Sequence, residues 1–140
     1  MKAVEWGWSH NCSFPSDMNA AHSLIDAVMS ELRESEWTPK EQFAINFALE
    51  EAFANAVHHG NKSDLSKNVH FSCTLTNSSA KFRIEDEGEG FDPGAVPDPT
   101  DAEHIMIASG RGVLLIKGFV SRVQWNDKGN VLEFEKDRAG

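Results

Sequence analysis

Cysteine and basic residues are scarce in this sequence, and each scarcity argues against a class of protein. The two cysteines, Cys12 and Cys73, are too few for a disulfide framework and lack metal-ligand spacing, so we expect two free thiols. Lysine and arginine total 13 against 22 acidic residues, which gives a formal net charge of −9. Because affinity for nucleic acid depends on basic side chains that neutralise phosphates, this composition disfavours direct nucleic-acid binding.

Long apolar runs are also missing. No stretch of eighteen apolar residues exists, so the sequence predicts no membrane-spanning helix. The first residues, MKAVEWGWSHNCSF, lack the charged start and apolar stretch of a signal peptide, and we expect a cytoplasmic location. No repeat or linker rich in Pro, Gly or Ser divides the 140 residues, so residues 1–140 are predicted to form one domain with one core.

The apolar pattern that is present predicts a strand followed by two helices. Residues 3–9 alternate as in a strand, and apolar residues over 15–34 recur at helical spacing. Thr38, Pro39 and Glu41 then form the capping pattern that starts a second helix.

The second half of the chain predicts mainly strands. The second helix is expected to end at Gly60, and two hairpins follow it, with turns at 77–79 and 127–129. Between the hairpins, residues 87–110 predict a long loop, a type that is usually functional, and a short helix comes after it. This order predicts an α+β fold, a two-layer sandwich with helices on one face of a mainly antiparallel sheet.

Polar side chains recur every four residues on the second helix, in the segment ALEEAFANAVHHGN. Glu51, Asn55 and His59 share one stripe of an α-helix, beside the small residues Ala48 and Ala52. Small neighbours leave room for a ligand, and carboxylate and amide oxygens suit Mg²⁺. Taken alone, the stripe is more simply interpreted as an ordinary solvated helix face.

A second candidate site follows in KFRIEDEGEGF. Strand alternation places Asp86 on the inward face at the end of an apolar row, and Gly88 and Gly90 come directly after it. An inward carboxylate can accept a hydrogen bond from an amino group such as that of adenine, and glycines let the backbone approach a flat ring. A tight turn at a strand end would give the same pattern.

The third candidate is SGRGVLLI, where Gly110 and Gly112 precede a helix. Free N–H groups at the positive end of a helix form a phosphate site. The segment is not a P-loop, because the Lys-Ser/Thr ending is missing, and it does not follow a strand as a dinucleotide fingerprint would. A flexible helix start is the alternative interpretation.

In this order, the three segments resemble the sequence boxes of the GHKL (Bergerat-fold) ATP-binding domain, and within it the small bacterial anti-sigma-factor serine/threonine kinases. EEAFANAVHHGN is similar to the N box, EDEGEGF to the first glycine box and GRGVLLI to the second, and the resemblance covers nearly the whole chain. It implies the Bergerat fold, with Glu51 as the catalytic residue, Asn55 as the Mg²⁺ ligand and His59 as the histidine of the N box.

The two glycine boxes supply the remaining site residues that the resemblance implies. Asp86 matches the adenine-binding aspartate, with Gly88 and Gly90 beside it, and Gly110 and Gly112 match the glycines near the phosphates. Some of these kinases have an arginine two residues before the second glycine box, where this chain has Ala108. Arg111, inside the box, and Lys117, in the next turn, are the candidates to compensate.

The resemblance also implies cofactors, a reaction and partners. ATP and Mg²⁺ would be bound, and the γ-phosphoryl group would pass to a serine or threonine of a partner protein. The expected partners are a sigma factor, which is held inactive, and an anti-anti-sigma protein of the STAS type, which is phosphorylated. Proteins of this kind are usually homodimers.

Other functions fit parts of the sequence. A non-catalytic ATP-binding anti-sigma module would keep the pocket but would not need Glu51. A histidine-kinase catalytic fragment needs a phospho-acceptor helix, for which we expect no room in 140 residues. A zinc enzyme using His58, His59 and Glu51 is disfavoured because adjacent residues of a helix diverge by roughly 100°. Trp6 and Trp8 are interpreted as core residues of the first strand, with an edge that pairs with another domain as the alternative.

Overall fold

The structure, a computed structural model, describes residues 6–88 and 116–138. In these ranges the chain forms, in order, β1 (Gly7–Pro15), α1 (Met18–Arg33), α2 (Pro39–Ala54), the π-helical turn η1 (Asn55–Gly60), β2 (Asn68–Thr76), β3 (Ser79–Glu85), β4 (Arg122–Trp125) and β5 (Val131–Asp137). Residues 116–119 are also helical. The order of elements follows the predicted one.

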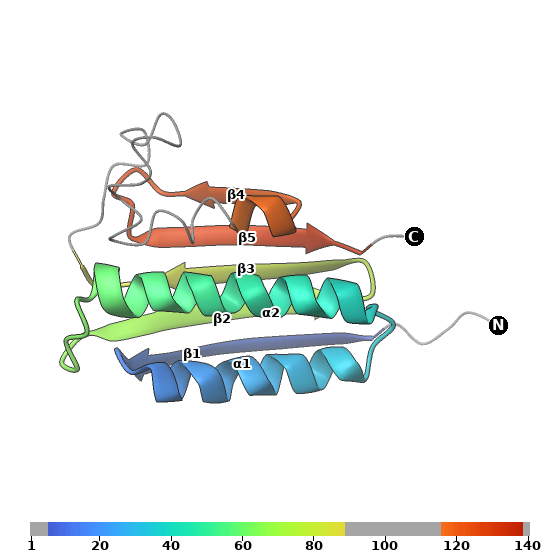
Figure 1. Cartoon of the computed structure of the whole chain (residues 1–140), viewed down its shortest axis with the longest axis horizontal. Coiled ribbons are helices and arrows are strands. Elements are labelled where there is room, and N and C mark those ends of the chain that lie inside the picture. Colours follow the sequence, from blue (N-terminus) through green and yellow to red (C-terminus); the bar gives the residue numbers. More distant parts are fainter. Residues whose placement is uncertain (1–5, 89–115, 139–140) are drawn as a thin grey trace.

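The described strands form one sheet with α1 and α2 on the same face (Figure 1). The strand order is β1-β2-β3-β5-β4, and each described pair of neighbours is antiparallel. The predicted α+β two-layer sandwich, with helices on one face of an antiparallel sheet, is therefore confirmed. Both hairpins are also present, as β2 with β3 and as β4 with β5.

Side-chain caps explain where the two α-helices begin. Asp17 caps α1 by accepting a hydrogen bond from Asn19 N at 3.0 Å. Thr38 caps α2 through the predicted capping box: Thr38 Oγ1 accepts from Glu41 N at 3.2 Å, and Glu41 Oε1 accepts from Thr38 N at 3.1 Å. Two N–H groups that a helix start leaves without partners are thereby satisfied.

Strand alternation builds the core between the sheet and the helices. On β3 the inward residues Ala80, Phe82 and Ile84 are buried, as predicted. Phe82 lies between Phe71 and Phe134, with ring centroids 6.3 Å and 4.9 Å away, distances at which aromatic rings attract one another. The helices contribute the apolar residues Leu24, Ile25, Val28, Leu32, Ile45, Ala48, Leu49, Ala52 and Phe53.

The first strand differs from its prediction. The alternation over residues 3–9 placed a strand there, whereas β1 covers Gly7–Pro15, and residues 1–5 lie outside the described part. The later half of β1 was missed because the exposed His10 and the half-buried Cys12 stand opposite Cys73 and Phe71, at positions where apolar residues would mark a strand more clearly. Within the described ranges, no helix has the length and apolar character that crossing a membrane requires.

Candidate functional site

Asp86 is the first residue after β3 and continues its inward row of side chains. It is 5% exposed, as the sequence predicted for an inward carboxylate. Asp86 N donates to Asn130 O at 2.9 Å, and Asn130 Nδ2 donates to Asp86 O at 3.1 Å. These two hydrogen bonds fix the end of β3 to the turn between β4 and β5.

The carboxylate of Asp86 is aligned by the residue two positions later. Gly88 N donates to Asp86 Oδ1 at 2.8 Å. Burial raises the pKa of the Asp86 carboxyl above its ordinary value, and the Gly88 N–H opposes this by favouring the charged form. Because a carboxylate has two acceptor oxygens, Asp86 can accept a further hydrogen bond from a ligand amine.

Two glycines allow the end of η1 to approach Asp86 closely. A Cβ atom on Gly60 would overlap the Asp86 carboxylate, and a Cβ atom on Gly88 would overlap the carbonyl group of Gly60. Any side chain at either position would therefore separate the end of η1 from the turn after β3. Gly88 belongs to the predicted adenine site, so the structure gives it a steric reason for being glycine.

Glu51 and Asn55 lie one turn apart where α2 ends. Both are half-buried, and the Asn55 N–H donates to the carbonyl oxygens of Glu51 and Ala52. Their placement on one side of the helix agrees with the spacing that singled them out.

The chain stays helical to Gly60, as predicted, but its last turn changes type. Over Asn55–Gly60 it is π-helical, and Asn61 N donates to Ala56 O, five residues back, at 2.8 Å. A π-turn holds more residues than an α-turn, so the expected α-helical stripe ends at Asn55 and does not extend to His59. Isolated π-turns are frequent at functional sites.

His59 is exposed at the surface of η1. Partial burial, and then the neighbouring His58, lower the pKa of His59 below its ordinary value. At neutral pH His59 is therefore mainly uncharged, and any contact that it makes with a ligand would be a neutral hydrogen bond.

A small pocket lies between α2 and the ends of β3, β4 and β5. Asn55 and Asp86 both line it, so the structure brings two of the predicted site residues together. The other lining residues are Ala52, Ala56, Ile84, Trp125, Gly129, Asn130 and Leu132. Its cavity volume of about 10 Å³ matches roughly one water molecule, so a ligand base would need the surrounding side chains to move. One carboxylate and two amides in an otherwise mainly apolar lining suit a flat, partly polar ring.

The rest of the predicted site falls outside the described residues. This applies to Gly90 and to the second glycine box with Gly110, Arg111 and Gly112, and also to Ala108. Among the residues that are described, no group of three His, Cys, Asp or Glu side chains is placed to hold a metal ion.

Three further residues around Asp86 were not singled out by the sequence. Trp125 and Asn130 line the pocket, and Asn61 is fully buried directly behind Gly60. Asn61 follows the last residue of η1 and Asn130 lies in the β4–β5 turn, positions where asparagine is common for local reasons. Their residue types therefore gave no signal, and only tertiary contacts distinguish them.

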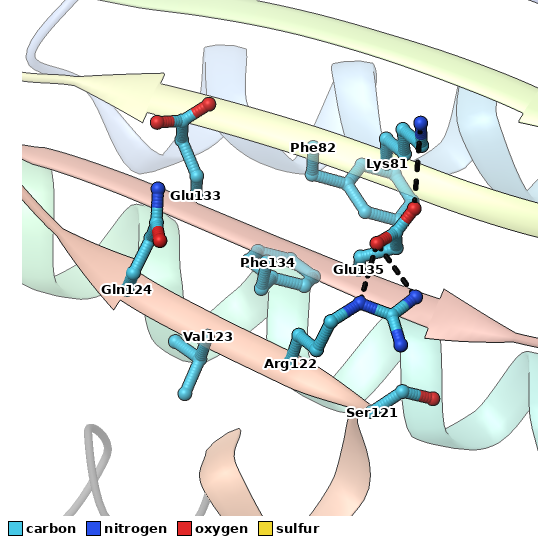
Figure 2. Close-up of a pocket in the computed structure, with 9 residues that line it drawn as sticks. All are labelled: Lys81, Phe82, Ser121, Arg122, Val123, Gln124, Glu133, Phe134 and Glu135. Carbon is cyan, nitrogen blue, oxygen red and sulfur yellow. Dashed lines mark hydrogen bonds and ion pairs between the residues drawn. The ribbon is translucent and has the colours of Figure 1, made fainter.

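A larger hollow, of about 600 Å³, lies over β3, β5 and β4 (Figure 2). Figure 2 shows Glu135 between Lys81 and Arg122, to which its oxygens are bound at 3.5 Å and 2.6 Å. Arg122 also pairs with Asp137 at 2.6 Å. Because these charged groups neutralise one another at an exposed surface, the hollow is a less suitable nucleotide site than the pocket around Asp86.

Residues 14–136 match the sequence model of the histidine kinase-like ATPase domain. No curated protein matches the sequence. Among solved structures, the fold is similar to the crystal structure of the RsbU and RsbW domains of Rv1364c from Mycobacterium tuberculosis, with a TM-score of 0.62 and 15% identity. The match covers 93% of this chain and 32% of that one, so this chain spans about a third of its length, and the likeness concerns the fold.

Proposed function

Because residues 14–136 match its model, the chain belongs to the histidine kinase-like ATPase family, and from this premise we propose that it is an ATP-dependent serine/threonine kinase. Its substrate would be an anti-anti-sigma protein of the STAS type, and it would also bind and inactivate a sigma factor. The proposal treats residues 1–140 as one domain that forms a homodimer.

The observation that carries the ATP part of the proposal is the setting of Asp86. This carboxylate is buried, aligned by Gly88 and fixed to Asn130, in a pocket that Asn55 also lines. A buried carboxylate is costly unless it has a hydrogen-bonding role, and a 6-amino purine supplies the donor that Asp86 would accept. Gly60 and Gly88 give the site its close-packed base.

The phosphate-transfer part of the proposal rests on Glu51 and Asn55. Glu51 would orient the acceptor hydroxyl and take its proton, while Asn55 would present its amide oxygen toward the phosphates. Mg²⁺, when bound, would neutralise phosphate charge in the transition state. Transfer of a phosphoryl group depends mainly on such positioning and charge stabilisation, so a carboxylate and an amide one turn apart are suitable groups.

The partners are proposed from two sources. The sequence resembles anti-sigma-factor kinases in all three boxes, and the fold is similar to a structure that contains an RsbW domain. The net charge of −9 suits a partner with a basic face.

Calorimetry of Mg²⁺–ATP binding tests the pocket. We expect the wild type to bind and Asp86→Asn and Asn55→Ala to lose at least about tenfold in affinity, since each loses a polar contact to the ligand. Asp127→Asn and Asn46→Ala are matched controls, because Asp127 is exposed in the β4–β5 turn and Asn46 lies on α2, more than two turns before Asn55. Absence of binding by the wild type would refute the ATP site.

A phosphotransfer assay then separates a kinase from a non-catalytic module. With γ-labelled ATP and STAS-type proteins from the same genome, the wild type should label one of them. Glu51→Gln should retain ATP binding while the rate falls by about a hundredfold or more. Glu50→Gln, at the neighbouring exposed position, is the control. ATP binding without labelling of any acceptor would favour the non-catalytic anti-sigma module.

A further inference from the structure

Asn61 is a fully buried polar residue at the centre of three chain segments. Its exposed fraction is 0%. Asn61 Nδ2 donates to Ser16 Oγ and to Asn68 O, both at 2.9 Å, and Asn61 Oδ1 accepts from Glu87 N at 2.7 Å. One side chain thus joins the segment after β1, the start of β2 and the turn after β3.

The contact with Glu87 places Asn61 next to the ligand-binding carboxylate. Asp86 and Gly88 belong to the proposed adenine site, and Glu87 lies between them. Asn61 therefore binds the N–H group at the middle of this site. The other held groups are Asp86 N, which donates to Asn130 O, and Gly88 N, which donates to Asp86 Oδ1. Three consecutive N–H groups of the turn are therefore fixed, each by a different residue.

The Glu87 side chain adds further hydrogen bonds between this turn and β2. Glu87 Oε1 accepts from Asn68 N at 3.0 Å, and Glu87 Oε2 lies 2.7 Å from His70 Nε2. His70 Nδ1 in turn lies 2.6 Å from Ser13 Oγ on β1. Unlike Asn61, these side chains are substantially exposed, so water can replace their hydrogen bonds when they are lost.

We propose that Asn61 is a positioning residue that aims the Asp86 carboxylate at the base of a nucleoside triphosphate and so sets selectivity for a 6-amino purine over a 6-oxo purine. The inference rests on the proposed function, since it specifies which base that pocket accepts. Asn61 reaches the base only through the Glu87 backbone and does not touch it.

Asn61 is expected to affect selectivity more than affinity, because binding a purine and distinguishing one purine from another depend on different contacts. Stacking and shape favour any purine, whereas discrimination at position 6 depends on one hydrogen bond from the amino group to Asp86. That bond weakens steeply when its geometry departs from linear. Without Asn61 the Glu87 N–H is released and the turn can shift. The loss of affinity is then larger for a 6-amino purine, which uses the hydrogen bond to Asp86, than for a 6-oxo purine.

The test compares Asn61→Ala with Ser16→Ala. Ser16→Ala removes a partner of Asn61 Nδ2 but leaves the bond from Glu87 N to Asn61 Oδ1, which makes it a matched control for a merely structural role. Affinities for ATP and for ITP, which carries a 6-oxo group, are measured by calorimetry at a temperature where all variants are folded. We expect Asn61→Ala to reduce the ATP:ITP affinity ratio by about tenfold and Ser16→Ala to leave it within about twofold.

A measurement without nucleotide separates failure of this inference from failure of the proposed function. Amide hydrogen exchange should be faster at Glu87 and Gly88 in Asn61→Ala than in the wild type, but unchanged in Ser16→Ala. If exchange at these amides is unchanged in Asn61→Ala, the inference is overturned even where no nucleotide binds. If Asn61→Ala loses equal affinity for ATP and for ITP, the proposed role in selectivity is overturned. If Asn61→Ala does not fold, Asn61→Ser, whose hydroxyl is too short to keep all three contacts, takes its place with the same expected results.

Discussion

At the scale of single residues, Asp86 combines a function with a cost in stability. Burial raises the pKa of its carboxyl, so between the unfolded value and the folded value the folded chain holds more protons than the unfolded chain. Its contribution to stability is therefore most favourable below the unfolded pKa and decreases as pH rises through the folded pKa. Above the folded pKa the protein holds a buried charge, which the Gly88 N–H compensates in part and which a ligand amine would compensate further.

Asp86→Asn should therefore stabilise the protein while it removes ATP binding. The amide keeps an oxygen for the Gly88 N–H and eliminates the buried charge, and we expect a gain of about 1 kcal/mol at pH 7. The measurement is urea unfolding at pH 7 and at pH 4, with the gain smaller at pH 4, where the wild-type carboxyl is closer to neutral. A variant less stable than the wild type at pH 7 would contradict this explanation.

The same carboxyl predicts how ATP binding depends on pH. Only ionised Asp86 accepts the hydrogen bond from the amino group, so affinity should fall on acidification at a pH above the ordinary range of an aspartate. Calorimetric titrations between pH 4 and pH 8 measure the affinity for ATP as a function of pH, with ITP as the comparison. ITP affinity should lack this dependence, because its base does not donate at position 6.

Two glycines offer a matched test of the close approach between η1 and the turn after β3. Gly88→Ala places a methyl group against the backbone of Gly60, and overpacking of this kind costs about 1–3 kcal/mol. Gly118→Ala meets no atom within 4 Å and lies in the helical residues 116–119, where alanine is favoured by about 0.5–1 kcal/mol. Thermal unfolding should thus move in opposite directions for the two variants.

At the scale of elements, α2 depends on its capping box for a defined start. Thr38→Ala removes the acceptor for Glu41 N and should cost about 1 kcal/mol, or roughly 3 °C in Tm. Thr38→Ser keeps the hydroxyl and should stay within about 0.5 kcal/mol of the wild type. Since the cap lies at the opposite end of α2 from Asn55, ATP affinity should not change, and an altered affinity would show that the two ends are coupled.

The end of the same helix shows what a local pattern cannot predict. The capping residues Thr38, Pro39 and Glu41 act within one turn, so their sequence was sufficient to place the start of α2. The π-turn over Asn55–Gly60 instead satisfies contacts of Gly60 with Asp86 and of Asn61 with Glu87, which are distant in sequence. Spacing by four consequently held for Glu51 and Asn55 but not for His59.

At the scale of the whole molecule, β1 is the feature most suited to self-association. Among the described strands it forms one edge of the sheet, and Gly7–Pro15 contains no Lys, Arg, Asp or Glu. Natural edge strands usually carry charges that prevent pairing. We infer that the expected homodimer forms by pairing of two β1 strands, with the partly buried Trp8 close to the interface.

Asn11→Lys tests this pairing, because Asn11 is exposed at the middle of β1 and a lysine would bring like charges together across the two strands. Sedimentation velocity should show a dimer for the wild type and a monomer for the variant. Asp26→Lys, on the exposed face of α1, is the control that changes charge elsewhere. A variant that remains dimeric would place the interface on another surface.

The sequence by itself determined the class of fold, the capped start of α2, both hairpins and the inward direction of Asp86. These features follow from periodicity, capping and turn chemistry, which act between residues close in the chain. Only the tertiary structure decided that Gly60 closely approaches Asp86 and Gly88, that Asn61 and Asn130 hold the Asp86 turn, and that His59 leaves the stripe of Glu51 and Asn55. These contacts join segments tens of residues apart, and buried polar groups there must find partners wherever the fold brings them together.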